Sequence, residues 1–343
     1  MDFGSLIPHD ETRVRHISQQ AADADNSNLG LFTKKDTLTS NDQRLITAAL
    51  GRSPTFRLSV TDMNGDRVME ERPVLKLRRV DIVQTDFRRL RDGDWLSDDT
   101  LNPFLKKYVQ DAVPLIHVFT THFFTRLGTG EQYQFSEVER WGRRISQRLR
   151  EEIDGHIIDG WDRLEVLYVP INIGNWHWVF IRVDMSRKAI ELYDSQGYVK
   201  PGNRQYLQDM RQYLYDELTK NIQQDRKPPF EVWRRDWRAV DKSREAPMQL
   251  NDYDCGLFTL LTIYLNSRGV PISRQMYDQH CIDEQRLRRS IAFQFIRDNE
   301  LATASSIMQY TTRIRTRSSA AKGLRHNKQG RNQQRMVAGG KRI

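Results

Sequence analysis

The chain has 343 residues, with 54 Lys and Arg against 45 Asp and Glu, and 38% of its residues are hydrophobic. No apolar run approaches the roughly 18 residues of a membrane-spanning helix, and the first residues lack the pattern of a signal peptide. Cys255 and Cys281 are the two cysteines. Two cysteines make no disulfide framework, so we expect a reducing compartment and no contact with a membrane.

Composition divides the chain into four predicted parts. Residues 1–52 are polar and predict a disordered or weakly structured extension, with one short helix near 41–50. Residues 53–80 alternate apolar and polar side chains around Asn64 and Gly65, which predicts a hairpin. The main domain is expected over residues 81–305, followed by a basic tail over 306–343.

The main domain begins with helical patterns. Ser97 or Asp98 can cap a helix that Pro103 should delay or kink, because proline lacks an N–H donor. Residues 114–127 predict a strand or a buried helix, and residues 136–153 a charged helix.

Strands then alternate with helices. Three strands are expected over residues 164–171, 176–183 and 189–193, and an edge or final strand over 228–240. Helices are expected over 203–222, 256–267 and 284–299. The helix over 203–222 has one apolar face, made of Tyr206, Leu207, Met210, Tyr213, Leu214 and Leu218. This order predicts an α+β fold.

Cys255 stands where a polar loop meets a long apolar helix. A helix N-terminus favours the thiolate, which is the nucleophilic form of cysteine. Gln249 lies six positions upstream and could donate a hydrogen bond to an oxyanion beside the sulfur. The alternatives are an inert buried thiol at Cys255 and a Gln249 that satisfies loop backbone.

A thiol nucleophile needs a base, and the base needs a partner that orients it. His177 lies in a strand pattern between Trp176 and Trp178, and Asp194 ends the next strand. A hairpin with a short turn would place these two side chains together. Alternatively, His177 is a packed strand residue and Asp194 closes a turn.

These motifs, in this order, resemble the ubiquitin-like-protein-specific proteases, also called SUMO or sentrin-specific proteases. The resemblance covers about residues 80–300. The segments that carry it are Trp95 to Asp99, Val169 to Asn172 with His177 and Trp178, Leu192 to Ser195, and Gln249 to Gly256.

The resemblance implies a papain-like cysteine protease fold of the SUMO-protease type, with a mixed central sheet flanked by helices. It implies that Cys255 is the nucleophile, His177 the base, Asp194 its orienting partner and Gln249 the oxyanion donor. Trp95 and Trp178 would cover the extended Gly-Gly tail of the modifier. No cofactor or metal is expected, and we expect a monomer.

The implied function is an isopeptidase that removes SUMO from target lysines and matures its precursor. The alternatives are a deneddylase, a deubiquitinase, a viral or bacterial processing protease, an acetyltransferase, or a non-catalytic binding module.

The basic character belongs to the tail. Residues 311–343 hold ten Lys and Arg and no acid, which leaves 44 basic and 45 acidic residues in the rest of the chain. The tail therefore suggests nuclear import, an acidic partner or nucleic acid, against the alternative of a solubilising segment. From it we expect the nucleus or the cytoplasm, with the nucleus favoured.

Overall fold

The computed structural model describes residues 46–47, 50, 57–61, 67–71, 73–77, 80–284 and 287–298. Most of the predicted helix near 41–50, the remainder of the N-terminal extension and the basic tail lie outside these residues. Within them, no helix combines the length and the apolar character needed to cross a membrane. The chain divides into two units, one over residues 1–37 and 89–290, the other over 38–88 and 291–343.

The described part of the second unit contains two hairpins and helical segments. Strand β1 (Arg57–Thr61) pairs antiparallel with β2 (Arg67–Glu71), and β3 (Pro73–Leu77) pairs antiparallel with β4 (Val80–Val83). The predicted turn at Asn64 and Gly65 lies outside the described residues. Helix α3 (Gln84–Arg88) follows.

A five-stranded mixed sheet organises the first unit, in the order β11-β10-β9-β8-β5. The three central strands are antiparallel, whereas each outer strand is parallel to its neighbour. The strands are β5 (Ile116–Val118), β8 (Val166–Ile173), β9 (His177–Asp184), β10 (Ala189–Tyr193) and β11 (Arg238–Asp241).

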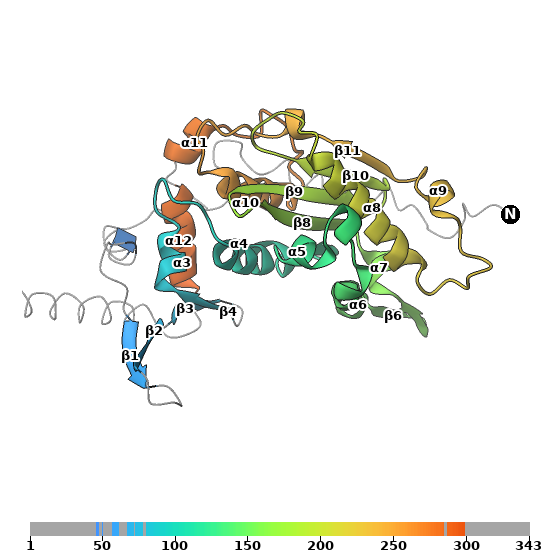
Figure 1. Cartoon of the computed structure of the whole chain (residues 1–343), viewed down its shortest axis with the longest axis horizontal. Helices are drawn as coiled ribbons and strands as arrows, with labels where there is room; N and C mark the ends of the chain where they lie inside the picture. The colour runs from blue at the N-terminus through green and yellow to red at the C-terminus, as the bar shows by residue number, and fades with distance from the viewer. Residues whose placement is uncertain are drawn as a thin grey trace, which may run out of the picture. The chain divides into compact units, whose positions relative to one another are not determined.

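Helices cover the sheet (Figure 1). Helix α8 (Asn203–Thr219) packs across β10 and β11, and α10 (Cys255–Asn266) packs against β9 and α4 (Asp98–Leu105). The predicted apolar face of α8 joins a core with alternate strand residues such as Val179, Ile181 and Val183. Alternation follows from the two-residue period of a strand.

The other elements of this unit are short. They are the π-helical turn Lys106–Gln110, α5 (Phe123–Leu127), the 3-10 turns Gly130–Gln132, Phe135–Glu137 and Ser243–Glu245, α6 (Glu139–Leu149), the hairpin β6 (Glu151–Ile153) and β7 (His156–Ile158), α7 (Gly160–Arg163), α9 (Phe230–Trp233) and α11 (Gln279–Glu284). Helix α12 (Leu287–Arg297) begins in this unit and ends in the other.

Three predicted elements need correction. The helix with Pro103 does not start late; it begins at Asp98, includes Pro103 and changes to π-helical geometry at Lys106. The charged helix ends at Leu149, and a hairpin follows. The expected strand over 228–240 is a short helix followed by β11. The helical turn lets Trp233 stack on Trp237, four residues later, which an extended chain would prevent.

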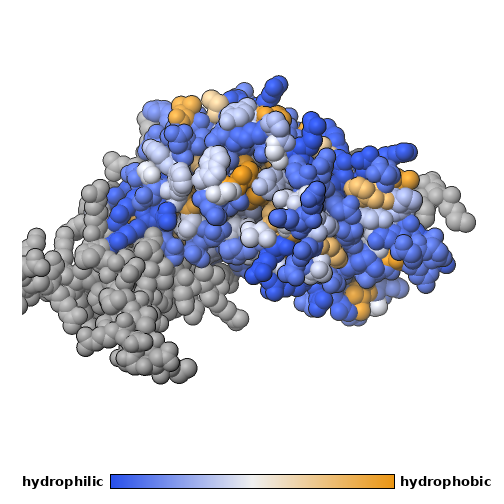
Figure 2. Space-filling view, viewed as in Figure 1, coloured by the Kyte–Doolittle hydropathy of each residue, from blue (hydrophilic) through white to orange (hydrophobic). Residues whose placement is uncertain are grey.

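The face shown in Figure 2 is mainly hydrophilic, and its apolar side chains lie in small separate groups. Among the described residues, the large exposed apolar side chains include Trp95, Trp176 and Leu250. All three belong to segments next to the candidate site described below.

Candidate active site

A tight hairpin places the candidate base. The connection between β8 and β9 is three residues long, and both Gly174 and Asn175 have positive φ, at 60° and 63°. Glycine and asparagine tolerate this conformation best. The turn therefore brings His177 to the first position of β9, opposite Ile173.

His177 and Asp194 meet as the hairpin spacing predicts. His177 Nε2 lies 2.8 Å from Asp194 Oδ1, and both side chains are buried. A carboxylate only accepts, so Nε2 carries the proton and Nδ1 is left for the thiol of Cys255, which lies within hydrogen-bonding reach. The three predicted residues thus lie together: His177 is hydrogen-bonded to Asp194, and Cys255 is close enough to help raise the pKa of His177.

Electrostatics favours an ion pair at this site. Burial alone would lower the pKa of His177, but hydrogen bonds and charges from Asp194 and Cys255 outweigh burial and raise that pKa above its ordinary 6.5. Burial would raise the pKa of Asp194, and the interactions with His177 and the Gln196 N–H lower it instead. Imidazolium and carboxylate are therefore each stabilised by the other.

A lysine also contacts the carboxylate. Lys200 Nζ lies 2.9 Å from Asp194 Oδ2, and the N–H of Gln196 donates to Oδ1 at 2.9 Å. Asp194 is thus held by a cation and a backbone amide as well as by His177, which fixes its orientation. The sequence gives no local signal for Lys200.

Cys255 is the first residue of α10 and is buried. The first N–H groups of a helix have no partner within the helix, so the N–H of Cys255 points out of the helix start. The carbonyl of Asp254 accepts the first intrahelical bond, from Phe258 at 2.9 Å. The placement of the thiol matches the sequence prediction.

Gln249 is tied to the residue beside Asp194. Ser195 Oγ donates to Gln249 Oε1 at 2.6 Å, and the Gln249 backbone N–H donates to Ser195 O at 2.9 Å. Gln249 Nε2 donates one hydrogen to Asn251 O at 2.6 Å. An amide nitrogen carries two hydrogens, so a second one is left for an oxyanion.

The two tryptophans differ in exposure. Trp95 is 42% exposed, and its indole N–H donates to Asp252 O at 3.1 Å. Trp178 is 2% exposed and donates to Leu96 O at 3.0 Å. The indole of Trp95 is therefore accessible at the surface, whereas Trp178 packs against Gly256, the residue after Cys255.

Gly256 packs directly against Trp178 and Leu96 because it has no side chain. A Cβ there would lie 2.9 Å from Trp178 Cδ1 and 3.0 Å from Leu96 Cβ. The indole cannot move away easily, since it is hydrogen-bonded to Leu96 O. Close packing therefore requires glycine at position 256, directly after Cys255.

Gly256→Ala should destabilise the protein by about 1–3 kcal/mol, because the new methyl group overpacks this contact. Gly202→Ala is the matched control, since a Cβ at Gly202 meets nothing within 4 Å and φ there is −63°. Thermal unfolding of both variants measures the difference. Equal stability of the two variants would contradict the packing argument.

The described residues include no group of three or more His, Cys, Asp or Glu that could hold a metal ion. What the arrangement can do chemically is nucleophilic attack by a thiolate. In such an attack, an imidazole placed like that of His177 can act as base and acid, and the N–H groups of a helix start can stabilise an oxyanion.

Comparison with known proteins places this geometry in a family. The model of the Ulp1 protease family, C-terminal catalytic domain, matches residues 94–298. The chain belongs to the Ulp1 protease family. Residues 94–298 contain all six predicted site residues.

Individual relatives match at modest identity. The chain is 28% identical over 248 residues to sentrin-specific protease 2 of Homo sapiens, covering 71% of this chain and 34% of that protein. It is 26% identical over 231 residues to ubiquitin-like-specific protease 1 of Saccharomyces cerevisiae, covering 67% and 32%. The chain thus spans about a third of the length of these curated relatives.

The fold is shared with solved structures of the family. The yeast Ulp1 protease domain, solved in complex with the SUMO orthologue Smt3, matches with a TM-score of 0.55 at 23% identity, covering 78% of this chain and 99% of that domain. The predicted α+β fold of the SUMO-protease type, with a mixed central sheet flanked by helices, is confirmed.

Proposed function

We propose that this protein is a cysteine protease that cleaves after the C-terminal Gly-Gly of SUMO. It would release SUMO from target lysines and mature its precursor. The observation that carries the proposal is the buried His177–Asp194 hydrogen bond of 2.8 Å, next to a thiol at the first residue of α10.

The first half of the reaction forms a thioester. The Cys255 thiolate attacks the carbonyl carbon of the terminal glycine, and the carbonyl oxygen becomes an oxyanion. The Cys255 N–H and the second hydrogen of Gln249 Nε2 stabilise that charge. His177, as imidazolium, gives its proton to the departing lysine amine when the C–N bond breaks.

The second half releases the modifier. His177, now neutral, takes a proton from water, and the hydroxide oxygen attacks the thioester carbon. The carbon–sulfur bond breaks, the thiolate is restored, and a free glycine carboxylate leaves. Asp194 holds the ring in the same orientation throughout, because Gln196 and Lys200 fix the carboxylate. No step requires a cofactor.

The exposed indole of Trp95 suits a backbone without side chains. A Gly-Gly segment has no Cβ atoms, so a flat ring can approach its peptide groups closely. Trp95 is anchored to Asp252 O in the loop before the nucleophile. We propose that Trp95 covers the tail and that Trp178 supports the site from below.

The names of the relatives favour SUMO as the modifier, and a panel of probes tests this choice. SUMO, ubiquitin and a Nedd-type modifier, each with a C-terminal electrophile, are incubated with the wild-type protein. We expect the SUMO probe to form a covalent adduct at Cys255 fastest. Cys281→Ala should still react, and Cys255→Ala should not.

Other results have separate meanings. Faster labelling by ubiquitin or the Nedd-type probe would assign another modifier to the same mechanism. Labelling of the Cys255→Ala variant would refute Cys255 as the nucleophile. A folded wild-type protein that reacts with no probe would argue against the proposed function.

A further inference from the structure

Asp254 is an acidic residue at a helix start that does not cap its helix. It precedes Cys255 at the N-cap position of α10, where an aspartate usually accepts from the first N–H groups. Its side chain makes no such bond. The carboxylate is 2% exposed, so its charge must be balanced by other groups.

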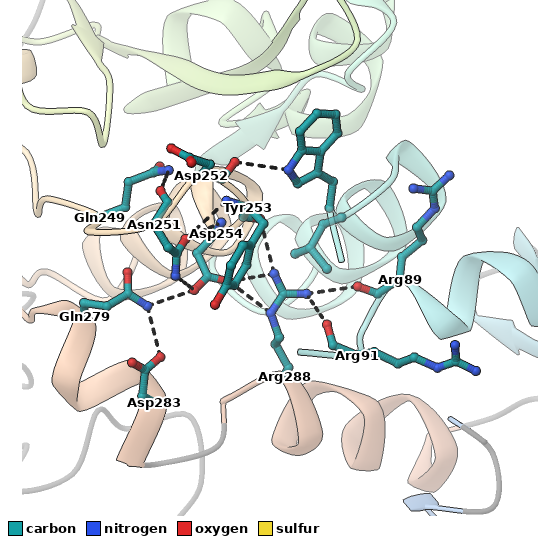
Figure 3. A network of polar contacts seen from close by, with 12 residues as sticks. Arg89, Arg91, Gln249, Asn251, Asp252, Tyr253, Asp254, Gln279, Asp283 and Arg288 are labelled. Carbon is teal, nitrogen blue, oxygen red and sulfur yellow. Dashed lines mark hydrogen bonds and ion pairs between the residues drawn. The ribbon is translucent and has the colours of Figure 1, made fainter. Parts of the chain in front are cut away.

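Arg288, on α12, supplies that balance (Figure 3). Its Nε and Nη2 lie 3.0 Å and 2.6 Å from Asp254 Oδ1. Asn251 Nδ2 and Gln279 Nε2 donate to Asp254 Oδ2 at 2.7 Å and 2.8 Å. Four donors hold the carboxylate away from the helix start, so the N–H groups there stay open to the oxyanion.

The same guanidinium also binds the segment that leads to Trp95. Arg288 Nη1 donates to Arg89 O at 3.0 Å and to Arg91 O at 2.8 Å, and Nη2 donates to Tyr253 O at 3.2 Å. All five N–H donors of the guanidinium therefore have acceptors. Arg288 is 4% exposed, which protects these bonds from competing water.

The loop between Gln249 and Cys255 is held at several points by this network. Asn251 Oδ1 accepts from the Asp254 N–H at 3.0 Å, and Gln279 Oε1 accepts from the Leu250 N–H at 3.2 Å. Trp95 Nε1 reaches Asp252 O in the same loop. The loop that carries the nucleophile and the oxyanion donor is thus joined to the segment that carries the substrate-covering indole.

We propose that Arg288 is a positioning residue of the active site. It fixes the distance between the Trp95 segment and the Gln249–Cys255 loop, and it keeps the Asp254 carboxylate off the N-terminus of α10. The proposal rests on the proposed cysteine-protease function. Arg288 acts only through Asp254 and the backbone carbonyls that it binds.

Arg288→Lys tests the geometry while keeping the charge. An ammonium is a point donor and cannot serve Asp254 and the three carbonyls together. We expect kcat/KM for a SUMO fusion, normalised to titrated active sites, to fall by about 10–100-fold, in line with small misplacement of reacting groups. Alkylation of Cys255 by iodoacetamide does not form an oxyanion. Its rate should change by less than about threefold, because His177 and Asp194 are unchanged in the variant.

Arg268→Lys is the matched control. Arg268 also donates to backbone carbonyls, those of Tyr264 and Tyr108, but it follows the C-terminal end of α10. The kcat/KM of Arg268→Lys per titrated active site should stay within about twofold of the wild-type value. The wild-type rate reports on the proposed function, and the ratio of variant to wild type reports on Arg288 alone.

A double variant separates positioning from folding. Arg288→Met alone strands a buried carboxylate and should lower the unfolding temperature. Asp254→Asn with Arg288→Met removes both charges and should regain thermal stability without regaining kcat/KM, because the link between the two segments is still missing. Recovery of activity together with stability would overturn the proposal. Two results for Arg288→Lys would also overturn the proposal. One is a wild-type kcat/KM per titrated site. The other is a rate of Cys255 alkylation that falls by the same factor as kcat/KM.

Discussion

Cys255→Ser should abolish cleavage of a SUMO fusion while the protein stays folded. Serine keeps a small polar side chain at the first position of α10, so the helix and its contacts persist. A hydroxyl is far less acidic than a thiol, so an imidazole that can hold cysteine as a thiolate cannot deprotonate serine to a comparable extent. We expect a loss of about 10³-fold or more in kcat, which is typical of removing a nucleophile.

Steady-state cleavage and thermal unfolding, measured on the same preparation, check this result. Cys281→Ser is the control, because Cys281 lies on α11 and makes no part of the His177–Asp194 chain. It should cleave at the wild-type rate. A wild-type cleavage rate in Cys255→Ser would contradict the proposed mechanism.

Local pattern predicts much of this site. His177 and Asp194 are seventeen residues apart on neighbouring strands with a short turn between them, so strand pairing alone brings them together. Cys255 lies where the polar loop changes to an apolar run, which marks the helix start. These three positions follow from the hydrophobic periodicity of the strands and helix and from the turn residues, both of which can be read from a single sequence.

Long-range contacts are different. Arg288 is 34 residues from Asp254, and no local repeat links an arginine on one helix to an aspartate before another. Trp178 illustrates the same limit, because a strand tryptophan can face either side. Only its packing against Gly256 and its hydrogen bond to Leu96 O place its side chain next to the start of α10. An aspartate before a helix is usually a capping residue, and no local pattern indicates that Asp254 binds Arg288 instead.

Gln249→Glu should lower kcat by about 10²–10³-fold with little change in KM. The glutamate oxygen can still accept from Ser195 Oγ, whose bond to Gln249 Oε1 is 2.6 Å long. The change removes the Nε2 donor and adds negative charge where the oxyanion forms. An interaction made only in the transition state affects kcat and leaves ground-state binding alone.

The comparison with Ser195→Ala decides between the two interpretations of Gln249. If Gln249 only satisfies the loop, its bonds to Ser195 and Asn251 are its whole role, and Ser195→Ala should impair cleavage about as much as Gln249→Glu. If Gln249 is the oxyanion donor, Ser195→Ala leaves Nε2 in place and should cost less than about tenfold in kcat. Per-site kcat for the two variants distinguishes these cases. Gln249→Glu also loses the Nε2 bond to Asn251 O, so the unfolding temperature of both variants is measured as well. A large kcat loss in Gln249→Glu alone, with an unchanged unfolding temperature, assigns the second Nε2 hydrogen to the transition state. Equal kcat losses in the two variants would assign Gln249 a structural role.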